Sequence, residues 1–368
     1  MFISNQEFAE TIHGEMGCIA CHGGDGTTDD KETAHVNMRR EPIAAEACDQ
    51  CHTDVHNDAN SLHSTLKGYD TVLQMRASEE TWEIIQEEAF GNHCESCHTS
   101  CGQCHVSRPT TTGAGLSAGH EFKKIPPMNL TCTGCHGSRI SDEYKGGNEG
   151  IPADLHWTKQ GMSCFSCHTG DELHGNLDFE QNHRYDGPQM PGCDSADCHP
   201  DVTADSNSDT PGHDANHLGK MACETCHAAE YKQCYSCHVQ KSEDGIPYYK
   251  IEPSVMDIKI GYNPIQSEDR PWKWVVLRHV PVDPDAFAYY GDDLLPNFDN
   301  RPTWVYATPH NTQLRGPQAA TCNSCHGNKE VFLTSDDLLD YEITANEGVI
   351  VDEADIPGPV EEPPPPAE

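Results

Sequence analysis

Cysteine and histidine side chains dominate the chemistry available to this 368-residue chain, which contains 20 Cys and 23 His. Nine cysteine pairs have the spacing C-x-x-C, and a histidine directly follows the second cysteine of each pair. A tenth pair, Cys193 and Cys198, has four residues between the thiols and is followed by His199. Every cysteine therefore belongs to a motif in which two thiols and one imidazole lie close together along the chain.

C-x-x-C-H is the attachment sequence of c-type haem, in which two thiols bond to the porphyrin edge and the histidine reaches the iron. Neither a disulfide nor a zinc ribbon requires a histidine at this fixed place. We therefore predict ten covalently bound haem c groups, and for Cys193–His199 the alternative is a zinc or disulfide site. The haem-bonding cysteines are Cys18, Cys21, Cys48, Cys51, Cys94, Cys97, Cys101, Cys104, Cys132, Cys135, Cys164, Cys167, Cys193, Cys198, Cys223, Cys226, Cys234, Cys237, Cys322 and Cys325. The proximal iron ligands are His22, His52, His98, His105, His136, His168, His199, His227, His238 and His326.

The histidines outside the motifs are numerous enough to give every iron a second imidazole. The candidate distal ligands are His13, His35, His63, His120, His156, His174, His183, His217, His279 and His310. Three others are uncertain: His56 lies one helical turn after His52, His93 directly precedes a motif cysteine, and His213 competes with His217. Of that last pair, His217 is closer in sequence to the motif at Cys223. Methionine is the alternative distal ligand.

With these motifs, residues 18–326 resemble a multihaem c-type cytochrome, here a decahaem one. The chain is similar to extracellular electron-transfer cytochromes, including the filament-forming (nanowire) kind. We expect mostly irregular coil with short α-helices at the haem motifs and a few β-strands, wrapped around a closely packed chain of haems. Because only 35% of the residues are hydrophobic, we expect haem to form the core.

Motif spacing predicts five segments. They are an N-terminal two-haem segment (1–91), a dense seven-haem core (92–240), a haem-free aromatic-rich flap (241–321), a C-terminal haem segment (322–346) and an acidic proline-rich tail (347–368). The flap is expected to cover haem faces and to supply His279 and His310, and its stretch KWVVLRHVPV predicts a strand. The alternative for the flap is a module that binds a substrate or a partner.

Charge and hydropathy exclude two classes of partner. The formal net charge of −37, with 60 acidic against 23 basic residues, would repel nucleic-acid phosphates. No apolar run reaches the roughly 18 residues of a transmembrane helix. Because haem is attached to these motifs outside the cytoplasmic membrane, we expect an extracellular or cell-surface protein, with the periplasm second. The segment MFISNQEFAETIHGEMG lacks the features of a signal peptide, so we expect a leader that was trimmed or lies upstream.

Two function classes remain open. Ten irons with two axial histidines each favour electron transfer, because a substrate cannot bind a six-coordinate iron. The alternative is a multihaem oxidoreductase, or a terminal reductase of metal oxides or humic substances. The expected partners are other cytochromes, extracellular acceptors and further copies of this chain, joined head to tail with the tail docked on a neighbouring subunit.

Overall fold

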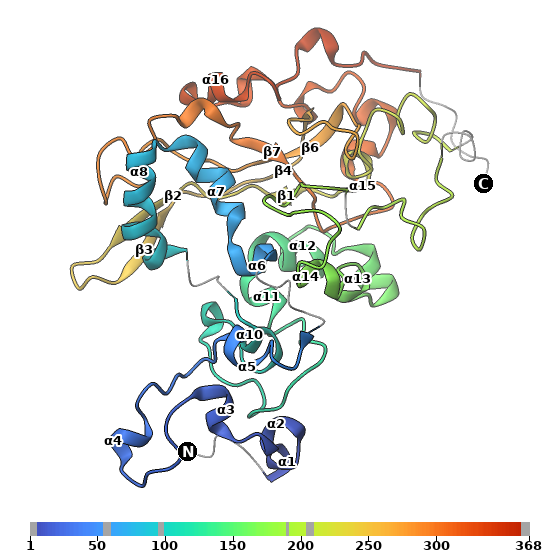
Figure 1. The fold of residues 1–368 in the computed structure, drawn as a ribbon. Helices are drawn as coiled ribbons and strands as arrows, with labels where there is room; N and C mark the ends of the chain where they lie inside the picture. The colour runs from blue at the N-terminus through green and yellow to red at the C-terminus, as the bar shows by residue number, and fades with distance from the viewer. Residues whose placement is uncertain (1–5, 54–59, 95–98, 189–190, 204–209, 362–368) are drawn as a thin grey trace. The chain divides into compact units, whose positions relative to one another are not determined.

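A computed structural model describes residues 6–53, 60–94, 99–188, 191–203 and 210–361. The chain forms two compact units, each assembled from distant stretches of sequence (Figure 1). Unit 1 comprises Met1–Lys67, Cys94–His136 and His168–Asn182, and unit 2 comprises Gly68–His93, Gly137–Cys167 and His183–Glu368. Each unit contains parts of several of the five predicted segments. The five segments therefore describe the spacing of the motifs and not the compact units.

Unit 1 consists of short helices joined by loops. Its helices are α1 (Gln6–Ala9), α2 (Ile12–Glu15), α3 (Cys18–His22), α4 (Lys31–Ala34), α5 (Ala44–Ala47), α6 (Leu62–Thr65), α10 (Cys101–His105), α11 (Cys132–Cys135) and α14 (Gly170–Leu173). Gly17 and Gly23 flank α3 with φ values of 76° and 71°. Glycine adopts this backbone conformation without a steric penalty, and these two residues limit α3 to the length of one haem motif.

Unit 1 buries almost no apolar side chain. Among its described residues, Cys94 is the one hydrophobic residue that is buried, whereas Ile12, Ile19 and Phe122 remain exposed. The hydrophobic effect scales with the apolar area removed from water. The side chains of unit 1 therefore cannot stabilise its fold by burying one another, and another source of buried surface is required.

Unit 2 contains longer helical stretches and all the described strands. Its helices are α7 (Lys67–Leu73, which begins at the last residue of the first stretch of unit 1), α8 (Glu79–Ile84), α9 (Gly91–His93), α12 (Asp142–Lys145), α13 (Leu155–Gln160), α15 (Glu224–His227) and α16 (Ile343–Asn346). A π-helical stretch, Ile85–Phe90, joins α8 to α9. Ser78 begins α8 with a capping box, in which its hydroxyl accepts from the Thr81 backbone N–H.

Three small antiparallel sheets lie in unit 2. The largest has the order β5 (Lys259–Tyr262), β6 (Trp274–His279) and β7 (Trp304–Tyr306). The other two pair β2 (Cys237–Lys241) with β3 (Pro247–Ile251), and β1 (Tyr231–Lys232) with β4 (Met256–Asp257). Strand β6 confirms the strand predicted at KWVVLRHVPV.

Strand β6 is buried on both faces. Val275 and Leu277 pack in one apolar cluster with Tyr306 of β7, while Val276 packs in another with Ile260 of β5. This alternation follows from the two-residue period of a strand. A third cluster lies against α8. Unit 2 therefore has an apolar core of its own, which the expectation of a core made of haem did not include.

The tail packs on its own chain as far as it is described. Val349 and Val351 are buried, and the Val351 N–H donates to the Leu333 carbonyl at 2.7 Å. Val360 exchanges two hydrogen bonds of 2.9 Å with the side chain of Asn323, inside the last haem motif. The docking of the tail on a neighbouring subunit stays a prediction, and residues 362–368 lie outside the described part.

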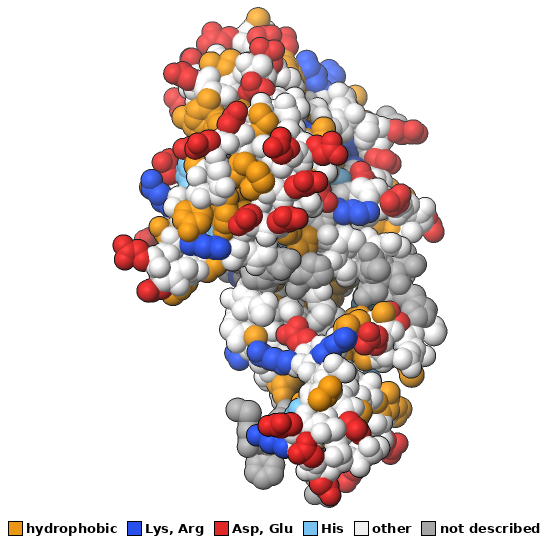
Figure 2. Space-filling view, turned by 60° about the vertical axis from the view of Figure 1, so that its left-hand side comes forward, with side chains coloured by type: hydrophobic (Ala, Val, Ile, Leu, Met, Phe, Trp, Pro, Cys, Tyr) orange, Lys and Arg blue, Asp and Glu red, His pale blue; other side chains and the backbone are white. Residues whose placement is uncertain are grey.

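Acidic side chains are spread over the face of the molecule drawn in Figure 2. They reflect the formal net charge of −37. Within the described residues, no helix combines the length and the apolar composition that crossing a membrane requires.

Candidate haem-binding site

The motif helices direct two thiols and one imidazole to the same side. In α3, Cys18, Cys21 and His22 occupy positions i, i+3 and i+4, which share one face of a helix. Helix α10 spans a whole motif in the same way, and α11 and α15 cover most of one. Single 3-10 turns lie at Cys164–Ser166 and Cys322–Ser324. This local geometry is what attachment to one porphyrin edge requires.

The motif with the longer spacer keeps the same backbone closure. In four C-x-x-C-H motifs the histidine N–H donates to the carbonyl of the first cysteine at 2.9–3.0 Å; the pairs are His52–Cys48, His136–Cys132, His227–Cys223 and His326–Cys322. In the tenth motif the His199 N–H donates to the Cys193 carbonyl at 3.1 Å. The two additional residues therefore form a bulge between the thiols, and the first cysteine and the histidine stay together.

Seven motif histidines each face one histidine from outside the motifs. The ring centroids lie 5.9–6.3 Å apart in the pairs His22–His120, His52–His13, His105–His174, His136–His63, His199–His156, His227–His213 and His326–His217. Each pair lies within one unit. The partners are far apart in sequence, so this common distance does not arise from local chain geometry.

The common distance matches the one expected for two imidazoles that would bind the same metal. Metal–imidazole bonds are about 2.0–2.1 Å, and with about 1.1 Å from that nitrogen to the ring centroid, two axial imidazoles stand about 6.2 Å apart. Direct ring stacking is much closer, as at His13 and Phe122, whose centroids are 4.0 Å apart. The His13–His52 rings are nearly parallel, at 14°, yet 6.0 Å apart. The seven pairs therefore fit two axial ligands better than a ring contact.

Hydrogen bonds at Nδ1 prepare these rings for a metal. Nδ1 of a motif histidine lies within hydrogen-bond distance of a backbone carbonyl in the pairs His22–Arg39 (2.8 Å), His105–Lys123 (2.6 Å), His227–Gln313 (3.1 Å) and His326–Gly358 (3.3 Å). A carbonyl only accepts, so the proton lies on Nδ1 and the neutral ring keeps its lone pair on Nε2. Carboxylates have the same role at His156, His217 and His168, through Asp154, Asp214 and Glu172.

The His136–His63 pair is also held in the neutral state. Burial, followed by the nearby His63 and His168, lowers the pKa of His136 to about 4. Burial likewise lowers the pKa of His63. Neutral imidazole is the form that binds a metal, so these two rings are ligand-competent at neutral pH.

No protein-family profile matches this chain, and searches of curated proteins and of solved structures returned no match. The argument for function therefore rests on the residues and geometry of this chain. Among these, the histidine pairs and their hydrogen bonds fit haem as the shared group, because each pair contains one C-x-x-C-H or C-x4-C-H histidine.

The pairing of two neighbouring histidines differs from the sequence expectation. His217, expected to serve the motif at Cys223, faces His326. The uncertain His213 faces His227 instead. Sequence proximity failed here because each of these pairs is set by the packing of unit 2 rather than by the local chain.

Three further histidines direct a nitrogen at protein groups. Nε2 of His279 lies 2.6 Å from Oε1 of Glu342, and Nε2 of His93 lies 2.9 Å from the Tyr290 hydroxyl. Nδ1 of His183 accepts from a backbone N–H at 3.2 Å. None of these three faces a motif histidine among the described residues, and their proposed roles as ligands stay predictions.

Other predicted residues are placed less fully. Nδ1 of His35 lies 2.6 Å from the Lys31 carbonyl oxygen. The lone pair of the neutral ring is therefore on Nε2, as in the paired rings with the same contact. The His310 backbone N–H donates to Glu143. His56, Cys97 and His98 lie outside the described residues.

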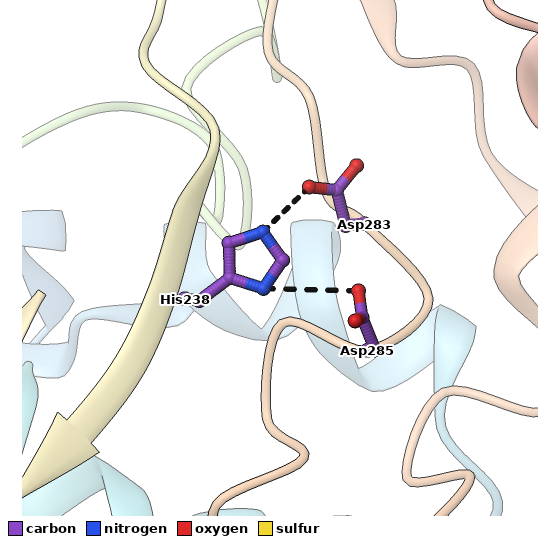
Figure 3. A group of neighbouring side chains, drawn as sticks. All are labelled: His238, Asp283 and Asp285. Atoms are coloured by element: carbon purple, nitrogen blue, oxygen red, sulfur yellow. Dashed lines mark ion pairs between the residues drawn. The ribbon is translucent and has the colours of Figure 1, made fainter. Parts of the chain in front are cut away.

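His238 stands apart from the paired motif histidines. Its motif continues into strand β2, and its ring lies between two carboxylates (Figure 3). Nε2 lies 2.8 Å from Asp283 and Nδ1 lies 3.7 Å from Asp285. These three side chains could gather a cation, since their ligand atoms lie within 4.8 Å of one another. In this arrangement Nε2 lies within hydrogen-bond distance of Asp283, and the role of His238 as a proximal iron ligand stays a prediction.

Motif thiols approach one another in a definite order. In unit 1, burial raises the pKa of the Cys21 thiol, and the nearby Cys48 raises it further. Burial and the nearby Cys135 raise the pKa of the Cys104 thiol in the same way. In unit 2 the neighbours are Cys167 with Cys198, Cys193 with Cys223, and Cys226 with Cys325. None of the described cysteines forms a disulfide.

Among the buried polar atoms without a protein partner in the described part of the chain, two lie on one strand near these motifs. They are the Tyr306 hydroxyl and the Trp304 indole N–H, both on β7. Burial raises the pKa of Tyr306, and the charges of Glu224 and Cys193 add to the effect, which locates the hydroxyl near two motifs. Haem propionates are acceptors of the kind that such buried donors need.

The carboxylates at Nδ1 are functional residues that the sequence analysis missed. Asp154 and Asp214 precede their histidines by two and three residues, and Glu172 follows His168 by four. An acidic residue at such a short spacing from a ligand histidine is a usable signal, because metal-bound histidines commonly donate their second N–H to a carboxylate.

Proposed function

We propose that this protein transfers electrons outside the cytoplasmic membrane along ten covalently bound c-type haems, most of them with two axial histidines. The observation that carries the proposal is the set of seven histidine pairs at 5.9–6.3 Å. Each pair joins a motif histidine to a distant one, as the sequence motifs require. No enzymatic step is part of the proposal.

The side chains of this protein have three tasks in that function. The motif thiols would hold the porphyrins, the paired imidazoles would bind the irons, and carbonyls or carboxylates orient several of these rings through Nδ1, among them His22, His105 and His156. When bound, haem supplies a one-electron iron couple whose potential the axial ligands and their surroundings set. With both axial positions filled by protein, a substrate has no position on these irons, which favours transfer over catalysis.

The thiol neighbours suggest the order in which the haems follow one another. In unit 2 they connect the motifs at Cys164, Cys193, Cys223 and Cys322 into one row.

A multihaem oxidoreductase is the second candidate, and the geometry of His238 favours it. This motif histidine faces carboxylates instead of a histidine in the described part of the chain. A haem attached at Cys234 and Cys237 would then be the one with an exchangeable axial position. A terminal reductase of metal oxides or humics is intermediate, because outer-sphere transfer needs no open position.

Intact mass and electron paramagnetic resonance test the proposed function. The protein mass should exceed the polypeptide mass by ten haems after denaturation, and the oxidised protein should show low-spin signals. Nine haems, with Cys193 and Cys198 free to alkylate, would remove the C-x4-C-H site from the proposal. Dominant high-spin signals would overturn histidine pairing altogether.

Carbon monoxide distinguishes the two candidates. A protein that only transfers electrons should leave the reduced spectrum unchanged on exposure to carbon monoxide. Binding to one haem in ten would favour the oxidoreductase. The variant Asp283→Asn identifies the haem that binds carbon monoxide. It should change carbon monoxide binding only if the reactive haem is the one next to His238.

Extracellular electron export through a head-to-tail filament remains part of this proposal. It rests on the resemblance to filament-forming cytochromes and on haem motifs near both chain ends, at Cys18 and Cys322. Negative-stain microscopy at high protein and salt concentration should show filaments. A chain ending at residue 361 is the right truncation, because Val349 and Val351 belong to the core. Monomers of the full chain under all these conditions would exclude the filament.

A further inference from the structure

Asp154 is a buried carboxylate whose hydrogen bonds all converge near one histidine pair. It precedes α13 as the N-cap residue and is 3% exposed. Oδ1 accepts from the His156 backbone N–H at 2.7 Å and lies 2.9 Å from His156 Nδ1, and Oδ2 accepts from the Thr312 N–H at 2.7 Å. A carboxylate surrounded by donors in this way is an acceptor at both oxygens, which is its ionised form.

The surrounding backbone fixes this carboxylate in place. The Asp154 N–H donates to the Tyr144 carbonyl at 3.1 Å, and the Leu155 N–H donates to the Thr312 carbonyl at 3.0 Å. His156 in turn faces His199, the histidine of the C-x4-C-H motif, with ring centroids 6.3 Å apart. Asp154 therefore contacts the ring nitrogen opposite the one that would bind iron.

The electrostatic surroundings of this pair differ from those of the others. Four motif histidines contact neutral backbone carbonyls through Nδ1. Asp214, which contacts His217, has a side chain that is 40% exposed, so water screens its charge. The Asp154 side chain is 4% exposed, and no Lys or Arg pairs with it among the described residues. An unscreened charge in a low-dielectric site acts strongly on nearby groups.

Resting on the proposed function, we propose that Asp154 is a positioning residue that lowers the reduction potential of the haem held by Cys193, Cys198 and the His199–His156 pair. A carboxylate at Nδ1 makes the imidazole a stronger donor, and its negative charge stabilises ferric over ferrous iron.

With this assignment, a haem in the interior of the unit 2 row has a lower reduction potential than its neighbours. The motif at Cys193 has thiol neighbours on both sides, Cys198 with Cys167 and Cys193 with Cys223. A haem of low potential there stays oxidised while its neighbours are reduced. Passage along the row then includes an uphill step at this position, which controls the rate between the two ends.

The test is a spectroelectrochemical titration of the full-length, haem-loaded protein and its Asp154→Asn variant. We expect the reduction potential of one haem, seen as one tenth of the absorbance change, to be higher in the variant than in wild type. The increase should be at least 59 mV, which corresponds to a tenfold change in the equilibrium constant of a one-electron couple. The low-spin resonance of that haem should shift as well. Asp214→Asn is the matched control, with a smaller shift because its carboxylate is exposed.

Asp154→Ser protects the test against a folding defect. Asparagine directs an N–H group at the Thr312 donor, whereas serine keeps a capping oxygen without charge or clash. Both variants should show the same displacement. If ten low-spin haems are present and neither variant shifts any haem more than Asp214→Asn does, the role of Asp154 is overturned while the proposed function stands. If the wild-type protein lacks the haems, the proposed function itself fails.

Discussion

The position of one proton separates the histidines that fit iron from those that do not. Where Nδ1 contacts a carbonyl, as at His22 and His105, the lone pair of Nε2 is free for a metal. At His279 the reverse holds, since Nε2 lies 2.6 Å from Glu342. His22 and His105 belong to haem motifs and His279 does not, but the sequence predicted all three as iron ligands, and only the groups packed around them show which ring nitrogen is free.

Replacing His213 and His279 tests this distinction. His213→Ala should leave the haem at Cys223 and Cys226 with one axial ligand, and about one tenth of the iron should become high-spin and bind carbon monoxide. His279→Ala should leave the iron signals unchanged. Electron paramagnetic resonance of both variants checks this, and a new high-spin signal in His279→Ala alone would reverse the assignment.

The buried Glu342 predicts a dependence of stability on acid. Burial raises the pKa of this carboxyl, but the hydrogen bond and charge of His279 outweigh burial and hold the pKa below its ordinary value. The folded state then binds the proton more weakly than the unfolded state, so the contribution to stability is present above the ordinary glutamate pKa of about 4.3 and declines as pH falls below it.

The variant Glu342→Gln should therefore lose about 1–3 kcal/mol of unfolding free energy at pH 7, the usual cost of an impaired buried hydrogen bond. The difference in unfolding free energy between this variant and wild type should become smaller as pH falls below about 4. Denaturant titrations at both pH values measure this. The exposed Glu347→Gln is the control, and an equal loss at both pH values would contradict the pKa argument.

At the scale of elements, β6 contributes buried side chains to two of the three apolar clusters of unit 2. Leu277 is fully buried between β5 and β7, whereas Leu314 is 77% exposed. Leu277→Ala should lower the unfolding free energy by about 2–5 kcal/mol, and Leu314→Ala should change it by less than about 0.5 kcal/mol. Thermal unfolding of the two variants provides the comparison. Equal effects would show that β6 is not part of the stabilising core.

Sequence alone predicted the elements whose causes are local. A C-x-x-C-H motif can form one helical turn without distant contacts, as α3 and α10 do, and the apolar run of β6 predicted a strand. It did not predict that the Cys237 motif would continue into β2, because pairing with β3 decides that conformation. It could not assign His120 to His22 either, since nothing local relates residues almost a hundred positions apart.

At the scale of the molecule, the two units differ in what can hold them together. Unit 2 has three apolar clusters around its strands. Unit 1 contains five of the ten motifs, and among its described residues Cys94 alone is a buried hydrophobic residue. This difference follows from the sequence, because the described strands and half of the aromatic residues lie in the stretch 231–306, which belongs to unit 2.

This difference predicts how the chain behaves without haem. Folding requires buried apolar area to offset the loss of conformational entropy, and unit 1 has almost none of its own. In protein produced without haem attachment, amides of unit 1 should exchange with solvent as in an unfolded chain. Amides of β5, β6 and β7 should remain protected by their own apolar clusters.

Hydrogen-exchange mass spectrometry of the haem-free and haem-loaded proteins makes the comparison directly. Haem loading should protect α3, α10 and α11 by several orders of magnitude, while the gain at β6 should be small because that strand is already buried by protein. The strand thus serves as the internal control within the same sample. Equal protection of both units without haem would mean that unit 1 folds through contacts other than haem burial, and the haem-based account of its stability would be wrong.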